Sequence, residues 1–216
     1  MRAEDEGQIT SLARSADGLG LLFERNRAWA EAKTHADPTF FSRLVGQQRP
    51  RYFWIGCSDS RVPATEIVDL DPGEMFVHRN VANLASEDDP SFAAALQFAV
   101  EILEVEHIIV VGHYGCGGIH AAMGPQTCDA IGRWLTPVRR VYRGSTGEEE
   151  CVPIDADELC ECNVRAQVEA LSRNSVVRQA WRRSMDLTLH GWAYSIGDGR
   201  LQPVCDPVKI SSLERN

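Results

Sequence analysis

Apolar runs of strand length alternate with amphipathic stretches of helix length along most of this chain. Three such runs are bounded by turn-forming residues, at 50–57, 73–80 and 107–113. The third run, HIIVVGH, has no polar face, which is typical of a central strand in a parallel sheet. Residues 186–204 contain two further runs on either side of Gly197-Asp198-Gly199, and this pattern predicts a β-hairpin.

The intervals between these strands carry helical periodicity. Asp89 followed by Pro90 is typical of an N-cap and a first helical position, and it predicts a helix over 89–106. Further helices are expected at the following ranges: 119–123, 128–144 with a break at Pro137, 155–174 and 175–184.

The first fifty residues also read as helical. Leu21, Leu22 and Trp29 recur close to helical spacing between charged residues, and Asp37-Pro38 predicts the start of a second short helix that runs to Gly46. An apolar face so far ahead of the sheet favours contact with a second subunit. We therefore expect these N-terminal helices to extend to a partner subunit.

Strands that alternate with helices indicate an α/β fold. We expect a mainly parallel central sheet, with about four parallel strands and one antiparallel edge strand, flanked by helices. The whole chain, 1–216, is predicted to form one domain, with an N-terminal helical arm at 1–48 and an α/β core at 49–216.

Composition excludes several classes of function. The formal net charge is −9 and no block of Lys or Arg stands out, so neither nucleic acid nor an anionic membrane is an expected partner. No apolar stretch approaches the roughly 18 residues of a membrane helix. The N-terminal residues are acidic and polar, which favours the cytoplasm. The seven cysteines are odd in number, which argues against a disulfide framework and towards thiols or metal ligands.

Reactive side chains gather where two strands end. Cys57 ends the first strand and is followed closely by Asp59 and Arg61, whereas the strand at 107–113 ends in His113, with Cys116 three residues later. In open α/β sheets, sites form beyond the carboxyl ends of the strands, at the point where strand order reverses. If these two strands are neighbours, two thiols and one imidazole converge. Three protein ligands with an open fourth position describe a catalytic zinc, whereas four closed ligands describe a structural one.

Each piece alone has a more ordinary interpretation. A cysteine at a strand end is commonly a small buried residue, and Gly115, Gly117 and Gly118 are also typical of a tight turn. Asp59 and Arg61 alone would suggest an ion pair that caps a turn. VGHYGCGG does not fit the dinucleotide pattern GxGxxG, and the interval between Cys57 and Arg61 is too short for a phosphatase loop.

Taken together, the segments CSDSR, HRNVAN, HYGCGG and LHGWAY resemble the β-class carbonic anhydrases in order and spacing. The resemblance covers roughly four-fifths of the chain. It implies reversible hydration of carbon dioxide to bicarbonate and a proton by zinc-bound hydroxide, with one Zn²⁺ per subunit. It also implies the zinc ligands Cys57, His113 and Cys116, and a catalytic dyad of Asp59 and Arg61.

A finer resemblance is to the bicarbonate-gated (type II) subclass. In that subclass the aspartate of the dyad becomes a zinc ligand in a closed form, which here would be Asp59. A regulatory bicarbonate pocket is implied at Trp54, Arg79 and Tyr194. The alternative interpretation is that the two aromatic residues belong to the core and that Arg79 is an ordinary ion-pair partner.

The resemblance leaves other functions open. A hydrolase of carbonyl sulfide or carbon disulfide on the same scaffold is one alternative, and a non-catalytic zinc-containing assembly protein is another. The expected partners are carbon dioxide or bicarbonate and the chain itself, as a homodimer or tetramer. His78 and His120 are proton-shuttle candidates, although a structural role is more typical of each. Cys160 and Cys162 would not share a helix face, so no second metal site is expected there.

Overall fold

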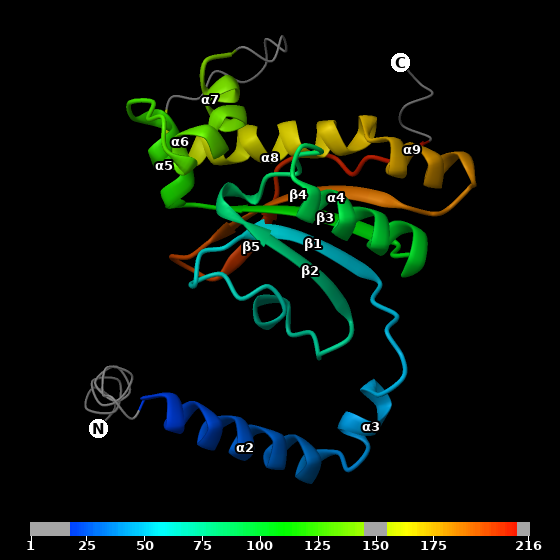
Figure 1. Ribbon diagram of the computed structural model, residues 1–216. Coiled ribbons are helices and arrows are strands. Elements are labelled where there is room, and N and C mark those ends of the chain that lie inside the picture. The colour runs from blue at the N-terminus through cyan, green and yellow to red at the C-terminus, as the bar shows by residue number, and fades with distance from the viewer. Residues whose placement is uncertain (1–17, 145–154, 211–216) are drawn as a thin grey trace. The chain divides into compact units, whose positions relative to one another are not determined.

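The computed structural model describes residues 18–144 and 155–210 (Figure 1). The chain divides into two compact units, residues 1–47 and 48–216. Among the described helices, none combines the length and the apolar character that crossing a membrane requires.

The first unit contains helices α2 (Gly18–Ala36) and α3 (Phe40–Leu44). No residue of α2 is buried, and Leu19 and Phe23 are each 73% exposed. Trp29 makes edge-on contacts with two rings of α3 and is still 44% exposed. The second helix begins later than the sequence pattern predicts, because the Asp37 carboxylate accepts hydrogen bonds from both the backbone and the hydroxyl of Thr39 and so forms a turn ahead of α3.

The second unit is built on a five-stranded sheet in the order β2-β1-β3-β4-β5 (Figure 1). The first four strands of this order pair in parallel, and β5 pairs antiparallel with β4. The predicted fold class is therefore confirmed. The strands occupy the following ranges: β1 Tyr52–Cys57, β2 Met75–Asn80, β3 His107–His113, β4 Thr188–Ser195 and β5 Arg200–Pro203.

The predicted helices are present, with small shifts at their ends. Asp89 caps α4 by accepting from the Ser91 N–H, and the helix then continues into a π-helical turn, η3, that ends before the predicted limit. Pro137 lies in the first turn of α7, so the expected break is confirmed. The ranges are α4 Pro90–Gln97, η3 Phe98–Ile102, α5 Gly117–Met123, α6 Ala130–Trp134, α7 Thr136–Tyr142, α8 Ala156–Arg173 and α9 Ser175–Arg182, with 3₁₀ turns η1 Glu66–Val68 and η2 Val81–Asn83.

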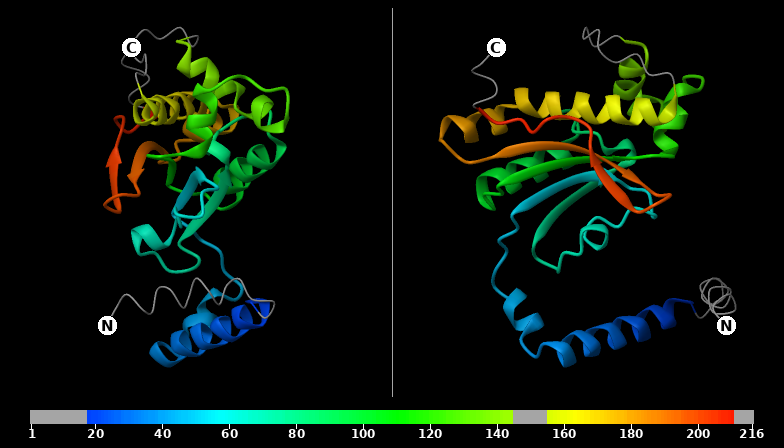
Figure 2. Two further views of the ribbon diagram at one scale, coloured as in Figure 1. Left: turned by 90° about the vertical axis from the view of Figure 1, so that its left-hand side faces the viewer. Right: turned by 180° about the vertical axis from the view of Figure 1, so that it is seen from behind.

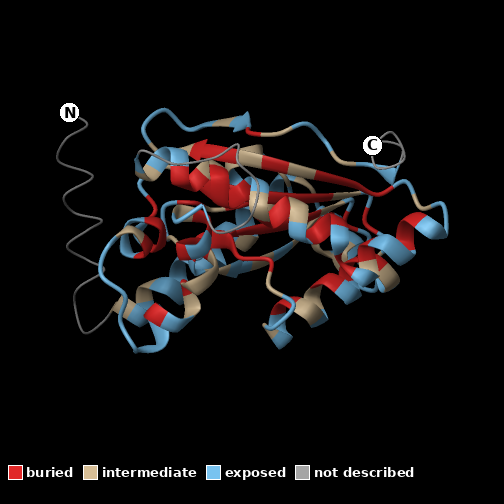
Figure 3. Ribbon diagram, turned by 90° about the horizontal axis from the view of Figure 1, so that it is seen from above, coloured by how far each residue is buried: buried red, intermediate tan, exposed pale blue. Residues whose placement is uncertain are grey.

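The two faces of the sheet are covered differently (Figures 2 and 3). Helices α4, α8 and α9 bury one face, where Phe53 and Ile108 belong to the largest apolar cluster. Trp54, on the other face, packs with Tyr194 and with residues of the connection between β1 and β2. Gly112 lets α8 lie close to β3, because a Cβ there would come within 2.7 Å of the Cys160 Sγ. This close approach brings side chains of α8 next to the end of β3, where the Cys160 thiol donates to the His113 carbonyl.

Candidate active site and metal centre

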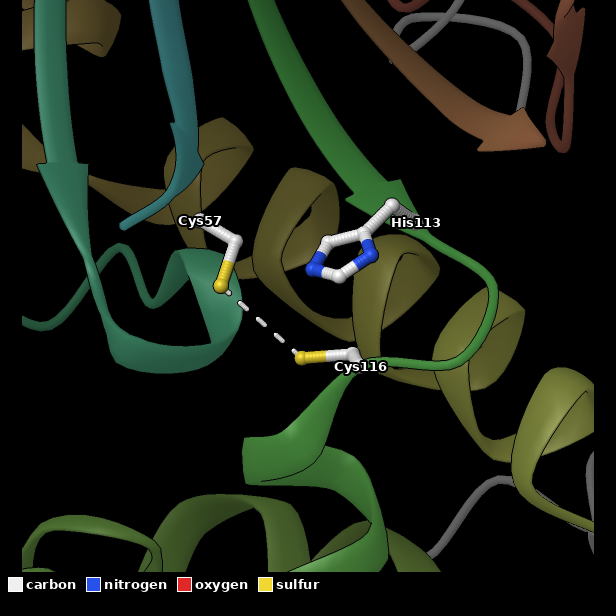
Figure 4. Close-up of side chains that lie close together, drawn as sticks. All are labelled: Cys57, His113 and Cys116. Atoms are coloured by element: carbon white, nitrogen blue, oxygen red, sulfur yellow. Dashed lines mark hydrogen bonds between the residues drawn. The ribbon is translucent and has the colours of Figure 1, made fainter. Parts of the chain in front are cut away.

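Three potential metal ligands converge where β1 and β3 end (Figure 4). Cys57 is the last residue of β1, His113 is the last residue of β3, and Cys116 is the N-cap of α5. One ligand atom from each lies within 4.8 Å of the others, and this is the one group of its kind among the described residues. The predicted convergence occurs because β1 and β3 are adjacent parallel strands, so their carboxyl ends meet at the same edge of the sheet.

The turn between His113 and Cys116 depends on glycine. Gly115 has φ +68, a left-handed conformation that glycine adopts without a steric penalty. It reverses the chain after β3 and directs Cys116 back towards Cys57. Gly118 allows the start of α5 to pack on η2, since a Cβ there would come within 2.9 Å of Val81 Cγ1 and 3.1 Å of Ala82 Cβ.

The geometry of these three residues fits a tetrahedral zinc ion. The two sulfur atoms are 3.8 Å apart, and two thiolates on one zinc at about 2.3 Å each would be separated by about 3.8 Å at a tetrahedral angle. The Nε2 atom of His113 is fully buried and has no hydrogen-bond partner. Its Nδ1 atom is 3.1 Å from the Tyr114 carbonyl oxygen, which can only accept. The ring proton therefore belongs on Nδ1, and the Nε2 lone pair is available to a metal.

The two thiols also need a cation if both are to be ionised. The Cys57 and Cys116 sulfurs share a hydrogen bond in which either one can be the donor, and this contact lowers the pKa of Cys57. The same contact raises the pKa of Cys116, because its proton is shared with a neighbouring sulfur. A second thiolate 3.8 Å away would repel the first. A divalent cation between them removes that repulsion, which is why such a pair is a good zinc ligand set.

Asp59 and Arg61 form a bidentate ion pair beside the ligands. Arg61 Nε is 3.0 Å from Asp59 Oδ1, and Arg61 Nη2 is 2.7 Å from Oδ2. These hydrogen bonds hold the pKa of Asp59 well below its usual range, so the carboxylate stays ionised at neutral pH. Asp59 Oδ2 lies 3.7 Å from His113 Nε2, at the edge of the metal position.

Trp54, Arg79 and Tyr194 lie on one face of the sheet, on three different strands. Arg79 pairs in register with Gly56, and the Trp54 indole lies over Gly56, where a Cβ would overlap it. Trp54 and Tyr194 share an apolar cluster. The Arg79 guanidinium donates to the Cys57 and Asp59 carbonyls, at 2.8 and 2.5 Å, and among the described residues none of its hydrogen bonds reaches Trp54 or Tyr194.

Helices α8 and α7 support the segment from His113 to Pro125, and the sequence patterns do not assign a role at this site to any of the side chains involved. On α8, the carboxylate of Glu161 accepts from the Tyr114 hydroxyl at 2.8 Å, and the Cys160 thiol donates to the His113 carbonyl at 3.3 Å. On α7, the buried Arg139 guanidinium donates to backbone carbonyls at the C-terminal end of α5, on Ala121, Ala122, Gly124 and Pro125. Arg139 falls at a position where helical periodicity predicts an apolar residue. This mismatch is the signal in the sequence that would have identified it.

The other described cysteines and histidines lie outside this cluster. His120 is exposed. His78 packs edge-on against Phe92, and burial there lowers the pKa of His78.

Five described cysteines are free, but Cys162 is disulfide-bonded. The expectation that the cysteines are thiols or metal ligands is therefore wrong at this position.

The fold and the site together define a carbonic anhydrase. The sequence profile of the carbonic anhydrase family matches residues 52–201. A carbonic anhydrase of Emericella nidulans is 42% identical over 84% of this chain and 81% of its own. The solved structure of a Coccomyxa beta-carbonic anhydrase in complex with acetazolamide has a TM-score of 0.85 and 35% identity, over 93% of this chain and 92% of that one. One of two tetrameric beta-carbonic anhydrases from Sordaria macrospora has a TM-score of 0.80 and 34% identity, over 89% and 99%. The chain belongs to the carbonic anhydrase family, in its β class, and it is an enzyme.

Replacing either cysteine of the cluster should abolish metal binding. Cys57→Ala or Cys116→Ala leaves two ligands, which cannot hold zinc firmly. We expect less than about a tenth of the wild-type zinc content after gel filtration, measured by elemental analysis and accompanied by loss of activity. Cys128→Ala is the control, because this free cysteine is exposed. Full zinc content and normal activity in Cys57→Ala would refute the ligand assignment.

Proposed function

We propose that this protein is a zinc-dependent carbonic anhydrase that interconverts carbon dioxide and bicarbonate, with one Zn²⁺ per subunit held by Cys57, His113 and Cys116. The observation that carries this proposal is the buried, unpartnered Nε2 of His113 beside two sulfur atoms 3.8 Å apart. When bound, zinc acidifies a coordinated water and so supplies a strong nucleophile at neutral pH.

The chain's own residues orient that nucleophile. Carbon dioxide is small and apolar and offers few groups to hold, so positioning must act on the attacking oxygen. With zinc bound, the ionised carboxylate of Asp59 would accept a hydrogen bond from the attacking oxygen and so orient it towards the substrate carbon. Arg61 fixes the carboxylate by two hydrogen bonds and donates a third, at 3.3 Å, to the Gly115 carbonyl between the metal ligands. Asp59 and Arg61 are accordingly proposed as the catalytic dyad.

The Asp59–Arg61 ion pair favours a catalytic zinc site over a purely structural one, because a structural site does not need an ionised hydrogen-bond acceptor beside an open coordination position.

The alternative substrates carbonyl sulfide and carbon disulfide are linear like carbon dioxide. The same acceptor would orient a nucleophile towards them, so only an assay separates these reactions.

We further propose that the enzyme belongs to the bicarbonate-gated subclass. The nearest oxygen of Asp59 is 3.7 Å from His113 Nε2, so a short movement away from Arg61 would make this carboxylate the fourth ligand. Arg79 supports the coupling, because its guanidinium binds the carbonyls of Cys57 and Asp59 themselves. A bicarbonate ion held by Arg79, with Trp54 and Tyr194 as the other walls of its pocket, would compete for these hydrogen bonds and so release the segment that carries Asp59.

We also propose that the chain acts in the cytoplasm as a homodimer or tetramer in which α2 and α3 pack on a partner subunit. The exposed apolar side chains of α2 support this, since Leu19, Leu22 and Phe23 would otherwise remain in water. The Sordaria macrospora relative is described as tetrameric. Fractionation of the source cells would test the compartment.

The central test is turnover. The zinc-loaded protein should hydrate carbon dioxide in a stopped-flow assay, and Asp59→Asn should lower kcat/KM by about 10²-fold, because the amide no longer accepts as an anion. Asp206→Asn, at an exposed position, is the matched control. Carbonyl sulfide and carbon disulfide are assayed with the same preparation. Turnover of either one with none of carbon dioxide would establish the hydrolase, and no turnover of any substrate with full zinc would contradict a catalytic role for this site.

Gating should appear in the response to pH and bicarbonate. Because the pKa of Asp59 is lowered, the carboxylate is ionised over the whole working range and is always able to bind the metal. As pH falls, hydroxide becomes scarce and competes less well, so the closed form gains and activity drops steeply. Bicarbonate that binds only the closed form should inhibit cooperatively in wild type.

Arg79→Ala tests this pocket directly. Inhibition by bicarbonate at fixed pH should become weaker and non-cooperative, with zinc content unchanged, whereas Arg178→Ala at an exposed site on α9 should behave as wild type. Simple product inhibition persists in all three proteins and sets the baseline. Superimposable bicarbonate curves for wild type and Arg79→Ala would mean that the gate does not exist here.

The oligomeric state is tested by measuring the molar mass in solution. Light scattering at micromolar concentration should give at least twice the chain mass of 24.0 kDa. Leu22→Asp with Phe23→Asp should shift the population towards monomer, because both side chains are exposed within the chain and would carry charge into the interface. A fully active protein of monomer mass would contradict the proposal.

A further inference from the structure

The segment that follows β2 has a strained backbone. In η2, Ala82 has φ 66 and ψ 25, and Asn83 has φ 49. Both are left-handed conformations that residues with a Cβ seldom adopt. Ala82 is also completely buried, so solvent contacts do not explain its conformation. Strain of this kind persists only where the surrounding structure enforces it, and it concentrates at functional sites.

The strained conformation directs a backbone donor at a metal ligand. The Ala82 N–H donates to the Cys57 sulfur, and a second backbone hydrogen bond reaches this sulfur from Asp59. Figure 4 shows the turn after β2 passing beside Cys57. Hydrogen bonds to a ligating sulfur fix its position and spread its negative charge, and such outer contacts tune the metal. The orientation of Ala82 therefore bears on the metal site although its side chain touches none of the reacting atoms.

A buried pair of amides on α8 holds this segment in place. Asn163 Nδ2 donates to the Ala82 carbonyl at 3.0 Å, and Asn163 Oδ1 accepts from Gln167 Nε2 at 3.0 Å. Gln167 Oε1 in turn accepts from the Ala85 N–H at 2.9 Å. Asn163 is 0% exposed and Gln167 is 6% exposed.

The direction of this chain of hydrogen bonds leaves no alternative amide orientation. The Ala82 carbonyl can only accept and the Ala85 N–H can only donate, so Asn163 must present its nitrogen to the first and Gln167 its oxygen to the second. Two side chains four residues apart on one helix thus hold both ends of the segment 82–85. Burial of these two amides in a core helix is unfavourable unless they are paired, and their pairing is with the segment that contacts Cys57.

We infer that Asn163 is a positioning residue for the metal centre: supported by Gln167, it holds Ala82 in the left-handed conformation that aims its N–H at the Cys57 sulfur. This inference rests on the proposed zinc site. It adds a third support to the ligands, separate from the turn at Gly115 and from the Asp59–Arg61 pair.

The experiment replaces the amide by an apolar group of similar shape. Asn163→Leu removes both hydrogen bonds and should weaken zinc affinity by about 10- to 100-fold, measured by competition with a chromophoric chelator. The cobalt-substituted protein should show a shifted or weaker thiolate-to-metal absorption band, because one sulfur has lost a fixed donor. Adding Ala82→Gly should recover part of the affinity, since glycine adopts the left-handed conformation without Asn163.

Asn174→Leu is the matched control. Asn174 is another buried amide, at the C-terminal end of the same helix, where it caps α9 and donates to Glu87. Its replacement should lower the stability of the metal-free protein to urea and leave zinc affinity and the cobalt spectrum unchanged. If Asn163→Leu does not fold, Gln167→Met removes the next link and should shift affinity in the same direction by a smaller factor.

The possible outcomes separate the two levels of inference. A wild-type protein that binds no zinc would overturn the proposed metal site. A wild-type protein that binds zinc, with the same affinity and cobalt spectrum in Asn163→Leu or in Gln167→Met, would overturn the positioning role alone. Equal losses of affinity in Asn174→Leu and Asn163→Leu would also overturn it, because the effect would then be a general loss of stability.

Discussion

The parallel pairing of β1 with β3 is the constraint on which the rest of the site depends. Its register runs from Tyr52–His107 to Gly56–Val111, so Cys57 and His113 leave the sheet at the same edge. Since β2 lies on the far side of β1, strand order reverses at this point, which is where open α/β sheets form their sites. Ligands from residues far apart in sequence are thereby placed by backbone hydrogen bonds rather than by flexible loops.

Charge balance explains why the site carries its acid outside the ligand set. With zinc bound as proposed, two thiolates would neutralise the charge of the cation, so a third anionic ligand would be held less strongly than at a three-histidine zinc. Asp59 instead has Arg61 as its counter-ion, at 2.7 Å. In the proposed gate the carboxylate would bind either the guanidinium or the metal. A small difference in free energy between these two positions is what a gate requires.

Sequence patterns predicted the sheet, its crossovers and the metal cluster, because these depend on local apolar runs and on side chains with distinctive chemistry. They placed the start of α3 too early, since they did not anticipate the turn that Asp37 forms with Thr39. They also missed Asn163 and Arg139. The partner of a buried amide or guanidinium cannot be predicted from the sequence, because any backbone carbonyl is an equally good acceptor, and only the tertiary structure shows which one it reaches.

The segment from Cys57 to Asp59 is where all these supports meet. Arg79 binds its carbonyls from β2, Arg61 binds its carboxylate, and the Ala82 N–H binds its sulfur. The sulfur and the carboxylate lie two residues apart in the chain, and each is held by its own donor. An anion that draws Arg79 away would loosen the carbonyls and leave the sulfur in place, because Asn163 holds Ala82 independently from α8. In the proposed gate, retention of the metal and movement of Asp59 would therefore depend on different contacts, so that the acid could move without release of the metal.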